Sequence, residues 1–201
     1  DEAHNLVERG REMYSALLYK EDFLEAKKVI QQKNKDSGRN YRGKKLVGQL
    51  DRVNRQMLAW KRECEEGCRV MKSLEGLLMS AEGLLEEYLE EEPPGEERKK
   101  LLDLYFQIDQ FFKIADRLDE SYVIYSMLDE NGSFLVKLFC IDTSTAIQEC
   151  LNKGNSTVFF SATLLPVTYY QSLLSQAKDD YAVYAKTPFL PEQRKGCELP
   201  L

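Results

Sequence analysis

The chain has 201 residues, of which 43% are hydrophobic and 31% are charged, and its formal net charge at pH 7 is −6. This length suits one or two globular domains with a sizeable core. The acidic balance excludes a protein that binds nucleic acid over its whole surface, although one basic strip can still do so. No apolar run reaches the roughly 20 residues of a membrane span, and five cysteines without framework spacing are typical of reduced thiols in the cytoplasm.

The first four residues, Asp1-Glu2-Ala3-His4, contain two adjacent carboxylates and the single histidine of the chain. A site that hydrolyses a nucleotide needs one carboxylate to hold Mg²⁺, usually through a water, and a second to orient or deprotonate the attacking water. Asp1 and Glu2 fit these two roles. His4 can pass the state of the γ-phosphate to a neighbouring hydroxyl through a ring hydrogen bond. The alternative interpretation is an acidic cap that opens a short helix.

Apolar residues at helical spacing dominate the next hundred positions. A first helix is predicted for residues 21–32, with an apolar face of Phe23, Ala26, Val29 and Ile30. A longer stripe then follows at steps of three and four: Leu46, Leu50, Val53, Met57, Trp60, Cys64, Gly67, Met71, Leu74, Leu78, Ala81, Leu85 and Tyr88. Pro93-Pro94-Gly95 stops this pattern, which resumes at Leu101, Leu104, Ile108, Phe111, Ala115 and Leu118. The two stripes are predicted to pack antiparallel across the Pro-Pro-Gly turn.

Gly67 leaves two arrangements open for the long stripe. Either one helix runs through it, or the chain forms three helices of similar length at 44–66, 68–91 and 96–119. Both arrangements give a helical bundle, and two stripes of different length joined by a tight turn favour an intramolecular hairpin in a monomer over a free-standing coiled coil. Cys64 and Cys68 supply at most half of a metal site and are better explained as small core residues.

The pattern changes from helical to mixed after Glu120. Two strands are predicted at 122–128 and 134–141, joined by the turn Asp129-Glu130-Asn131-Gly132. A short helix follows to Asn152, capped by Ser144 or Thr145 and ended by Gly154. The remaining expectations are a strand at 157–160 that is covered on both faces, a helix at 167–176 and a last strand at 181–184.

Basic and acidic residues are segregated along the chain. Residues 27–55 contain ten basic and two acidic residues, whereas residues 63–98 contain twelve glutamates and three basic residues. The basic stretch is interpreted either as a contact for a single nucleic-acid strand or as a solvated face that neutralises the acidic helix beside it. The candidate contacts are Lys33, Lys35, Arg39, Arg42, Lys44 and Lys45, with Tyr41 as a stacking residue.

A second polar motif, Ser161-Ala162-Thr163, follows the apolar run at 157–160 and offers two hydroxyls as receivers for His4. Together, Asp-Glu-Ala-His and Ser-Ala-Thr resemble motifs II and III of superfamily 2 helicases. The helix-rich segment of about 160 residues between them resembles the XPD/DinG family of DNA helicases, in which an arch domain lies between the two motifs. The flanking residues 1–18, 134–151, 157–174 and 187–189 are also similar to that family.

The resemblance implies a fold that is predominantly α, an antiparallel helical bundle, with a smaller α/β portion from a RecA-like motor domain. It divides the chain into the exit from motor domain 1 (1–18), the arch (19–120) and a β-hairpin with the return to motor domain 1 (121–201). Its implied activity is ATP-dependent unwinding of DNA, with ATP and Mg²⁺ as cofactors and single-stranded DNA as partner. Asp1 would hold Mg²⁺ through a water, Glu2 would be the catalytic base, and His4 with Ser161, Ala162 and Thr163 would couple hydrolysis to strand movement.

The sequence contains no Gly-rich phosphate loop with its Lys-Ser/Thr, and no strand precedes Asp1. We therefore expect a fragment that is inactive alone. The resemblance implies a phosphate loop upstream and, in many relatives, four cysteines that bind an iron–sulfur cluster there. Two alternatives remain open: a non-catalytic helical module that binds DNA or protein, and an RNA helicase with an unusual insertion.

Overall fold

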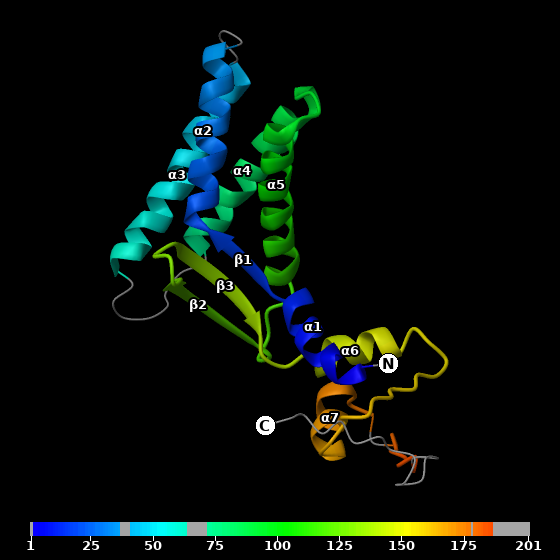
Figure 1. Cartoon of the computed structure of the whole chain (residues 1–201). Helices are drawn as coiled ribbons and strands as arrows, with labels where there is room; N and C mark the ends of the chain where they lie inside the picture. The colour runs from blue at the N-terminus through cyan, green and yellow to red at the C-terminus, as the bar shows by residue number, and fades with distance from the viewer. Residues whose placement is uncertain (1, 37–40, 64–71, 178, 187–201) are drawn as a thin grey trace, which may run out of the picture.

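The computed structural model describes residues 2–36, 41–63, 72–177 and 179–186. It is mostly helical with a small antiparallel sheet, so the prediction of a mainly α protein is confirmed. Four long helices stand side by side at one end of the molecule (Figure 1). They are α2 (Lys20–Asp36), α3 (Tyr41–Glu63), α4 (Lys72–Glu91) and α5 (Glu96–Ala115). No helix within the described ranges is long and apolar enough to cross a membrane.

The apolar stripes of the sequence form the core of this bundle. Residues at the predicted steps of three and four are buried on all four helices: Phe23, Ile30, Leu46, Leu50, Val53, Met57, Leu74, Leu78, Ala81, Leu85, Leu101, Leu104, Ile108 and Phe111. Each fully buried Leu, Ile or Phe side chain stabilises the fold by about 1.5–3 kcal/mol relative to an exposed one. Burial along these faces therefore holds the bundle together.

The three-helix arrangement of the long stripe is confirmed. α3 ends at Glu63 and α4 begins at Lys72, and these two helices pack against each other rather than continuing as one rod. Gly67, Cys64 and Cys68 lie outside the described residues. The predicted turn at Pro93-Pro94-Gly95 also holds, because α4 and α5 pack together on either side of it.

A three-stranded sheet underlies the bundle. Its strands β1 (Ala16–Tyr19), β2 (Tyr122–Leu128) and β3 (Phe134–Cys140) lie in the order β1-β3-β2, and both pairs are antiparallel. The β2–β3 hairpin is as predicted: Gly132 has φ of +75°, and the Asp129 carboxylate accepts the backbone N–H groups of Asn131 and Ser133. β1 was not predicted, because its run Ala-Leu-Leu-Tyr is short and does not alternate.

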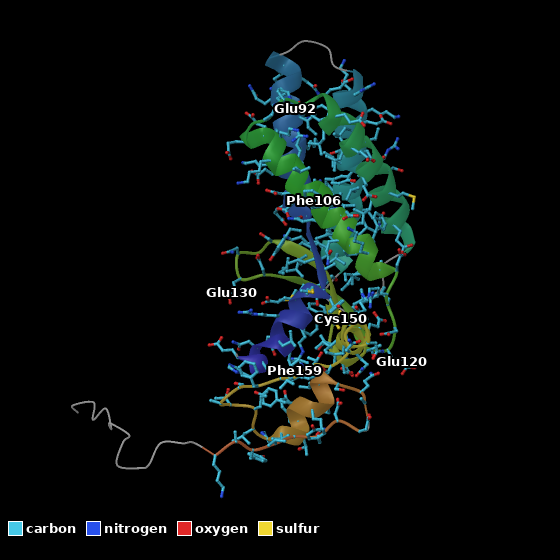
Figure 2. The ribbon with its side chains drawn as sticks, turned by 90° about the vertical axis from the view of Figure 1, so that its right-hand side faces the viewer. Glu92, Phe106, Glu120, Glu130, Cys150 and Phe159 are labelled. Atoms are coloured by element: carbon cyan, nitrogen blue, oxygen red, sulfur yellow. The ribbon has the colours of Figure 1, made fainter. Side chains whose placement is uncertain are left out.

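The sheet and the bundle share one core. Ala16 and Leu18 of β1 and Phe134, Val136 and Leu138 of β3 are buried in the same cluster as the helix faces. At the opposite end of the molecule, Val7, Ile147 and Leu174 form a second, smaller cluster. This cluster joins α1 (Leu6–Met13), α6 (Ser144–Leu151) and α7 (Val167–Leu174), and Figure 2 shows Phe159 at this end and Glu92 at the bundle end.

The start of α6 corrects the predicted cap. The residue before the helix is Thr143, whose side chain makes no capping hydrogen bond, and neither Ser144 nor Thr145 caps the helix. Instead, the Asp142 carboxylate accepts the backbone N–H of Ser144 at 2.9 Å. An aspartate is the stronger acceptor here, because its negative charge also interacts favourably with the positive end of the helix dipole. The helix ends at Leu151, and the N–H of Gly154 donates to the Leu151 carbonyl.

The predicted strands at 157–160 and 181–184 are wrong. Neither range is a strand: Val158 and Phe160 are 81% and 60% exposed rather than covered on both faces, and Tyr181 and Val183 are 87% and 79% exposed. A strand requires a neighbour that takes its backbone hydrogen bonds, and the described sheet consists of β1, β3 and β2 alone. The predicted helix at 167–176 is present as α7, whereas residues 187–189 lie outside the described part of the chain.

Candidate functional site

The two polar motifs meet in space although they are far apart in the sequence. The Nδ1 atom of His4 lies 2.9 Å from the Ser161 hydroxyl oxygen, across a separation of 157 positions. The same Nδ1 atom lies 3.0 Å from the hydroxyl oxygen of Thr163. His4 and Ser161 are partly buried, whereas Ala162 and Thr163 are exposed. The predicted proximity of the histidine and the two hydroxyls is therefore present.

The small apolar cluster positions this contact. A single turn of 3-10 helix, η1 (Ala3–Asn5), carries His4 and continues into α1, which packs on α6 and α7 through Val7. The backbone N–H of Ala3 donates to the carbonyl of Phe160 at 3.4 Å, which draws the second motif alongside the first. Because α6 and α7 flank the 152–166 segment, the same packing that buries Val7 also fixes the distance between His4 and Ser161.

The three side chains form a closed set of hydrogen bonds. The two hydroxyl oxygens lie 3.2 Å apart, and the backbone N–H of Thr163 donates to the Ser161 hydroxyl at 3.2 Å. Nδ1 of a neutral imidazole has either one lone pair or one N–H, so it makes one strong hydrogen bond at a time. Ser161 and Thr163 therefore compete for His4.

Glu2 has an unusual backbone. Its φ of 66° and ψ of 36° lie in the left-handed region, which residues other than glycine rarely occupy. Its exposed carboxylate accepts a hydrogen bond from the Asn5 side chain at 3.1 Å. Left-handed residues of this kind cost of order 1 kcal/mol or more and concentrate at functional sites. Glu2 therefore has a local feature, independent of its motif, that is consistent with a functional role.

The predicted Mg²⁺ ligand, Asp1, lies outside the described residues. Within the described ranges no group of three or more His, Cys, Asp and Glu side chains is arranged to hold a metal ion. The carboxylate of Glu2 is the described acidic group nearest in sequence to the expected metal position. The described residues of the two motifs are therefore Glu2 and the group of His4, Ser161 and Thr163.

The candidate nucleic-acid contacts are here called the basic strip. The described members lie where α2 ends and α3 begins, at the end of the bundle farthest from His4, and they form two groups. Lys33 forms ion pairs with Glu92 and, at 3.8 Å, with Glu97, while Arg42 pairs with Glu91 at 2.5 Å. The second group consists of Lys35, Lys44 and Lys45, which are exposed and have no carboxylate partner among the described residues. Arg39 lies outside the described residues, and Tyr41 begins α3 but its side chain is not described.

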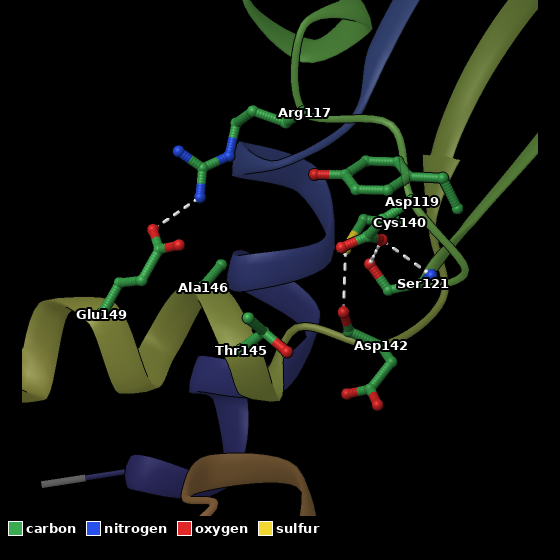
Figure 3. Close-up of a pocket in the computed structure, with 9 residues that line it drawn as sticks. Arg117, Asp119, Ser121, Cys140, Asp142, Thr145, Ala146 and Glu149 are labelled. Atoms are coloured by element: carbon green, nitrogen blue, oxygen red, sulfur yellow. Dashed lines mark hydrogen bonds and ion pairs between the residues drawn. The ribbon is translucent and has the colours of Figure 1, made fainter.

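A pocket that the sequence did not reveal lies between the end of the sheet and α6 (Figure 3). Arg117, just beyond α5, reaches across it to pair with Glu149 of α6 at 2.7 Å and stacks over the ring of Tyr14. Burial, and secondarily the nearby Cys140 thiol, raises the pKa of Tyr122 to about 12. Arg117 and Glu149 neutralise each other across the pocket, and the Asp119 carboxylate accepts hydrogen bonds from the Ser121 backbone N–H and hydroxyl. No sequence spacing marked Arg117, because its partners are distant in the chain.

Neither a protein-family model nor a curated protein matches this sequence. The functional interpretation therefore depends on the two motifs and on the geometry that surrounds them.

Proposed function

We propose that this chain is the part of an ATP-dependent DNA helicase of the XPD/DinG type that contains motif II, the helical arch and motif III. The observation that carries the proposal is the contact of His4 Nδ1 with the hydroxyls of Ser161 and Thr163. A tetrapeptide and a tripeptide as short as Asp-Glu-Ala-His and Ser-Ala-Thr also occur by chance in unrelated sequences. A hydrogen-bonded contact between them, across 157 positions, is what coupling of the motifs requires.

The proposed roles follow from the chemistry of each group. Asp1 would hold Mg²⁺ through a water, and Glu2 would take a proton from the water that attacks the γ-phosphate. His4 senses whether the γ-phosphate is present and transmits its state by exchanging Ser161 for Thr163 as hydrogen-bond partner. Hydrolysis of ATP would supply the chemical energy, Mg²⁺ would neutralise charge on the phosphates, and single-stranded DNA would be the polymer that is moved.

In this proposal the bundle of α2 to α5 is the arch, and α1, α6 and α7 belong to a RecA-like first motor domain. The support for this division is that the two groups of helices have separate hydrophobic clusters. An iron–sulfur cluster, where present, would be held by cysteines outside these 201 residues.

The decisive experiment uses the longer protein that contains this chain. Glu2→Gln keeps the shape of the side chain but loses the base, so we expect ATP and Mg²⁺ binding to be retained and kcat to fall by about 10²-fold or more. Near-normal ATP hydrolysis in this variant would place the base elsewhere. The 201-residue chain by itself should neither hydrolyse ATP nor bind it at micromolar concentration, because its sequence contains no phosphate loop.

The coupling role has a separate test. A Ser161→Ala, Thr163→Ala double variant should retain DNA-stimulated ATP hydrolysis but unwind less duplex per ATP consumed, because the step lost lies after hydrolysis. Thr168→Ala, an exposed threonine on α7, is the matched control and should leave the ratio unchanged. An equal fall in hydrolysis and unwinding would assign the hydroxyls to the chemical step instead.

One observation favours the non-catalytic alternative for the bundle. Lys33 and Arg42, two of the expected DNA contacts, are occupied by glutamates of α4 and the following turn. A bundle whose basic residues neutralise its own acidic helix serves as a structural or protein-binding module. Absence of DNA-stimulated ATPase activity from the longer protein would select this alternative.

A further inference from the structure

The sheet has one face on the side away from the bundle, and its positions are partly or fully exposed except Leu135, which is buried. Side chains alternate between the two faces of a strand, and the residues of β1 and β3 that face the bundle are buried in its core. The register of the two strand pairs assigns the remaining positions to the opposite face, here called the outer face. The outer face consists of Leu17, Tyr19, Val123, Tyr125, Met127, Leu135, Lys137 and Phe139. In Figure 1 the bundle lies over one side of the sheet, while α1 and α6 lie beyond the end where β3 finishes.

Aromatic rings surround a lysine on the outer face. Lys137 lies on the central strand, opposite Leu17 on one side and Tyr125 on the other. Its ammonium nitrogen is 4.8 Å from the centre of the Phe139 ring. The rings of Tyr125 and Phe139 have centroids 6.4 Å apart and meet edge to face at 70°. Tyr19 is partly exposed at the far edge, so three rings and one cation share a single surface.

This surface differs in charge from the rest of the chain. The sequence has 34 acidic residues, but none occupies a position of the outer face, and its single charged residue is Lys137. No described carboxylate pairs with Lys137. Val123 and Met127, at its β2 edge, are 44% and 46% exposed. The outer face is therefore apolar, aromatic and positively charged, in a protein whose net charge is −6.

The central lysine distinguishes between possible occupants. The cores of protein–protein interfaces are depleted in lysine, because burying its charge is costly. Single nucleic-acid strands instead bring phosphates that neutralise a cation and bases that stack on aromatic rings, and sheets with exposed aromatics are a recurring platform for them. The combination on the outer face therefore matches a single strand better than a protein.

We propose that the outer face binds single-stranded nucleic acid, with bases stacked on Tyr125, Phe139 and Tyr19 and a phosphate on Lys137. The inference rests on the proposed function for the expectation that nucleic acid is the substrate. It differs from that function in assigning the strand to the sheet rather than to the bundle's basic strip or the motor domain.

The test measures binding of a fluorescent 15-nucleotide thymidine strand to the 201-residue chain by anisotropy. A strand with the same phosphates but without bases separates stacking from charge attraction, and it should bind at least about fivefold more weakly. Tyr125→Leu and Phe139→Leu keep apolar bulk and remove the aromatic ring, so each should weaken thymidine binding by at least about fivefold. Lys137→Gln should lower the slope of log affinity against log salt by about 0.7.

Tyr184→Leu is the matched control, because this tyrosine is 71% exposed and lies outside the sheet. Circular dichroism should show the same melting temperature for all variants. Equal binding of the strands with and without bases, unchanged affinity in both ring variants, or no binding by the parent chain would each overturn the inference. So would a dimer, detected by sedimentation, that Tyr125→Leu dissociates, because the face would then serve a second copy.

Two measurements on the longer protein distinguish strand binding by the outer face from helicase activity. If the longer protein hydrolyses ATP on DNA normally with Tyr125→Leu and Phe139→Leu, the outer face is not the strand site and the helicase proposal stands. If the longer protein has no ATPase activity but the 201-residue chain binds strands through their bases, the helicase proposal fails and the binding face remains.

Discussion

Reversing the charge of single residues in the basic strip should have different effects on stability for its ion-paired residues and its exposed lysines. Lys33 and Glu92 form an ion pair in which the side chains are only 24% and 10% exposed, so solvent screens it less than a fully exposed pair. Lys33→Glu removes this attraction and brings carboxylates together, which should lower the free energy of unfolding by about 1.5 kcal/mol. For a chain of this length the melting temperature should fall by about 3–6 °C. Lys44→Glu, at an exposed lysine with no described partner, should change stability by less than about 0.5 kcal/mol.

The assay combines thermal unfolding with strand binding over a range of salt. At high salt the melting difference caused by Lys33→Glu should shrink, because ions screen the carboxylate repulsion. If the exposed group contacts phosphates, Lys44→Glu should lower the salt slope of log affinity by about 0.7 while Lys33→Glu leaves the slope unchanged. An unchanged melting temperature for Lys33→Glu, together with weaker strand binding, would show that Lys33 contacts nucleic acid and does not serve mainly as an ion-pair partner of Glu92.

Three further outcomes follow from single positions. Gly132→Ala should cost about 1–2 kcal/mol, because φ there is +75°, whereas Gly83→Ala on an open helix surface should stabilise by up to about 1 kcal/mol; urea unfolding measures both. Burial, and then neighbouring carboxylates, raises the pKa of Glu82, so its ionisation opposes folding above that pKa; Glu82→Gln should raise the melting temperature at pH 7 and not at pH 4. Burial also raises the pKa of Cys140, so a thiol reagent followed by mass spectrometry should modify exposed Cys150 before Cys140, and equal rates at these two thiols would contradict the buried placement.

Local pattern was sufficient to predict the bundle. Steps of three and four place residues such as Leu50 and Leu78 on one face of a helix, and that face has to be buried whatever the rest of the chain does. The β2–β3 hairpin was predictable for the same reason, since Asn131-Gly132 specifies the turn and fixes the register of its two strands. Both elements depend on residues close together in the sequence.

The errors occurred where a structure depends on distant partners. The run at 157–160 has the composition of a buried strand, but the described sheet supplies no strand beside it, and Val158 remains 81% exposed. β1 is the opposite case. Its four residues have no strand pattern in the sequence, but they form a strand because β3 supplies backbone hydrogen bonds. Composition sets what a segment can become, and its partners decide the outcome.

The candidate site was predictable in its residues but not in its geometry. Its motif residues could be named from the sequence, but the short distances from His4 to both hydroxyls depend on the packing of α1 against α6 and α7, which no periodicity encodes. The left-handed backbone of Glu2 and the ion pair between Arg117 and Glu149 of α6 could not be predicted from the sequence either. Each depends on contacts between segments more than 30 positions apart or on a backbone angle that residue type does not specify.

The topology connects the candidate site with the sheet by a short route. The chain passes between the small cluster and the bundle twice, once from α1 into β1 and once from β3 into α6. These two strands are direct neighbours, and the backbone N–H of Cys140 donates to the Ser15 hydroxyl at 3.0 Å where they leave the sheet. Any movement of His4 relative to Ser161 that reaches the bundle through the backbone must therefore act on the β1–β3 pair. Because the outer face includes side chains of the same two strands, a nucleic acid bound there would contact the element that carries both connections.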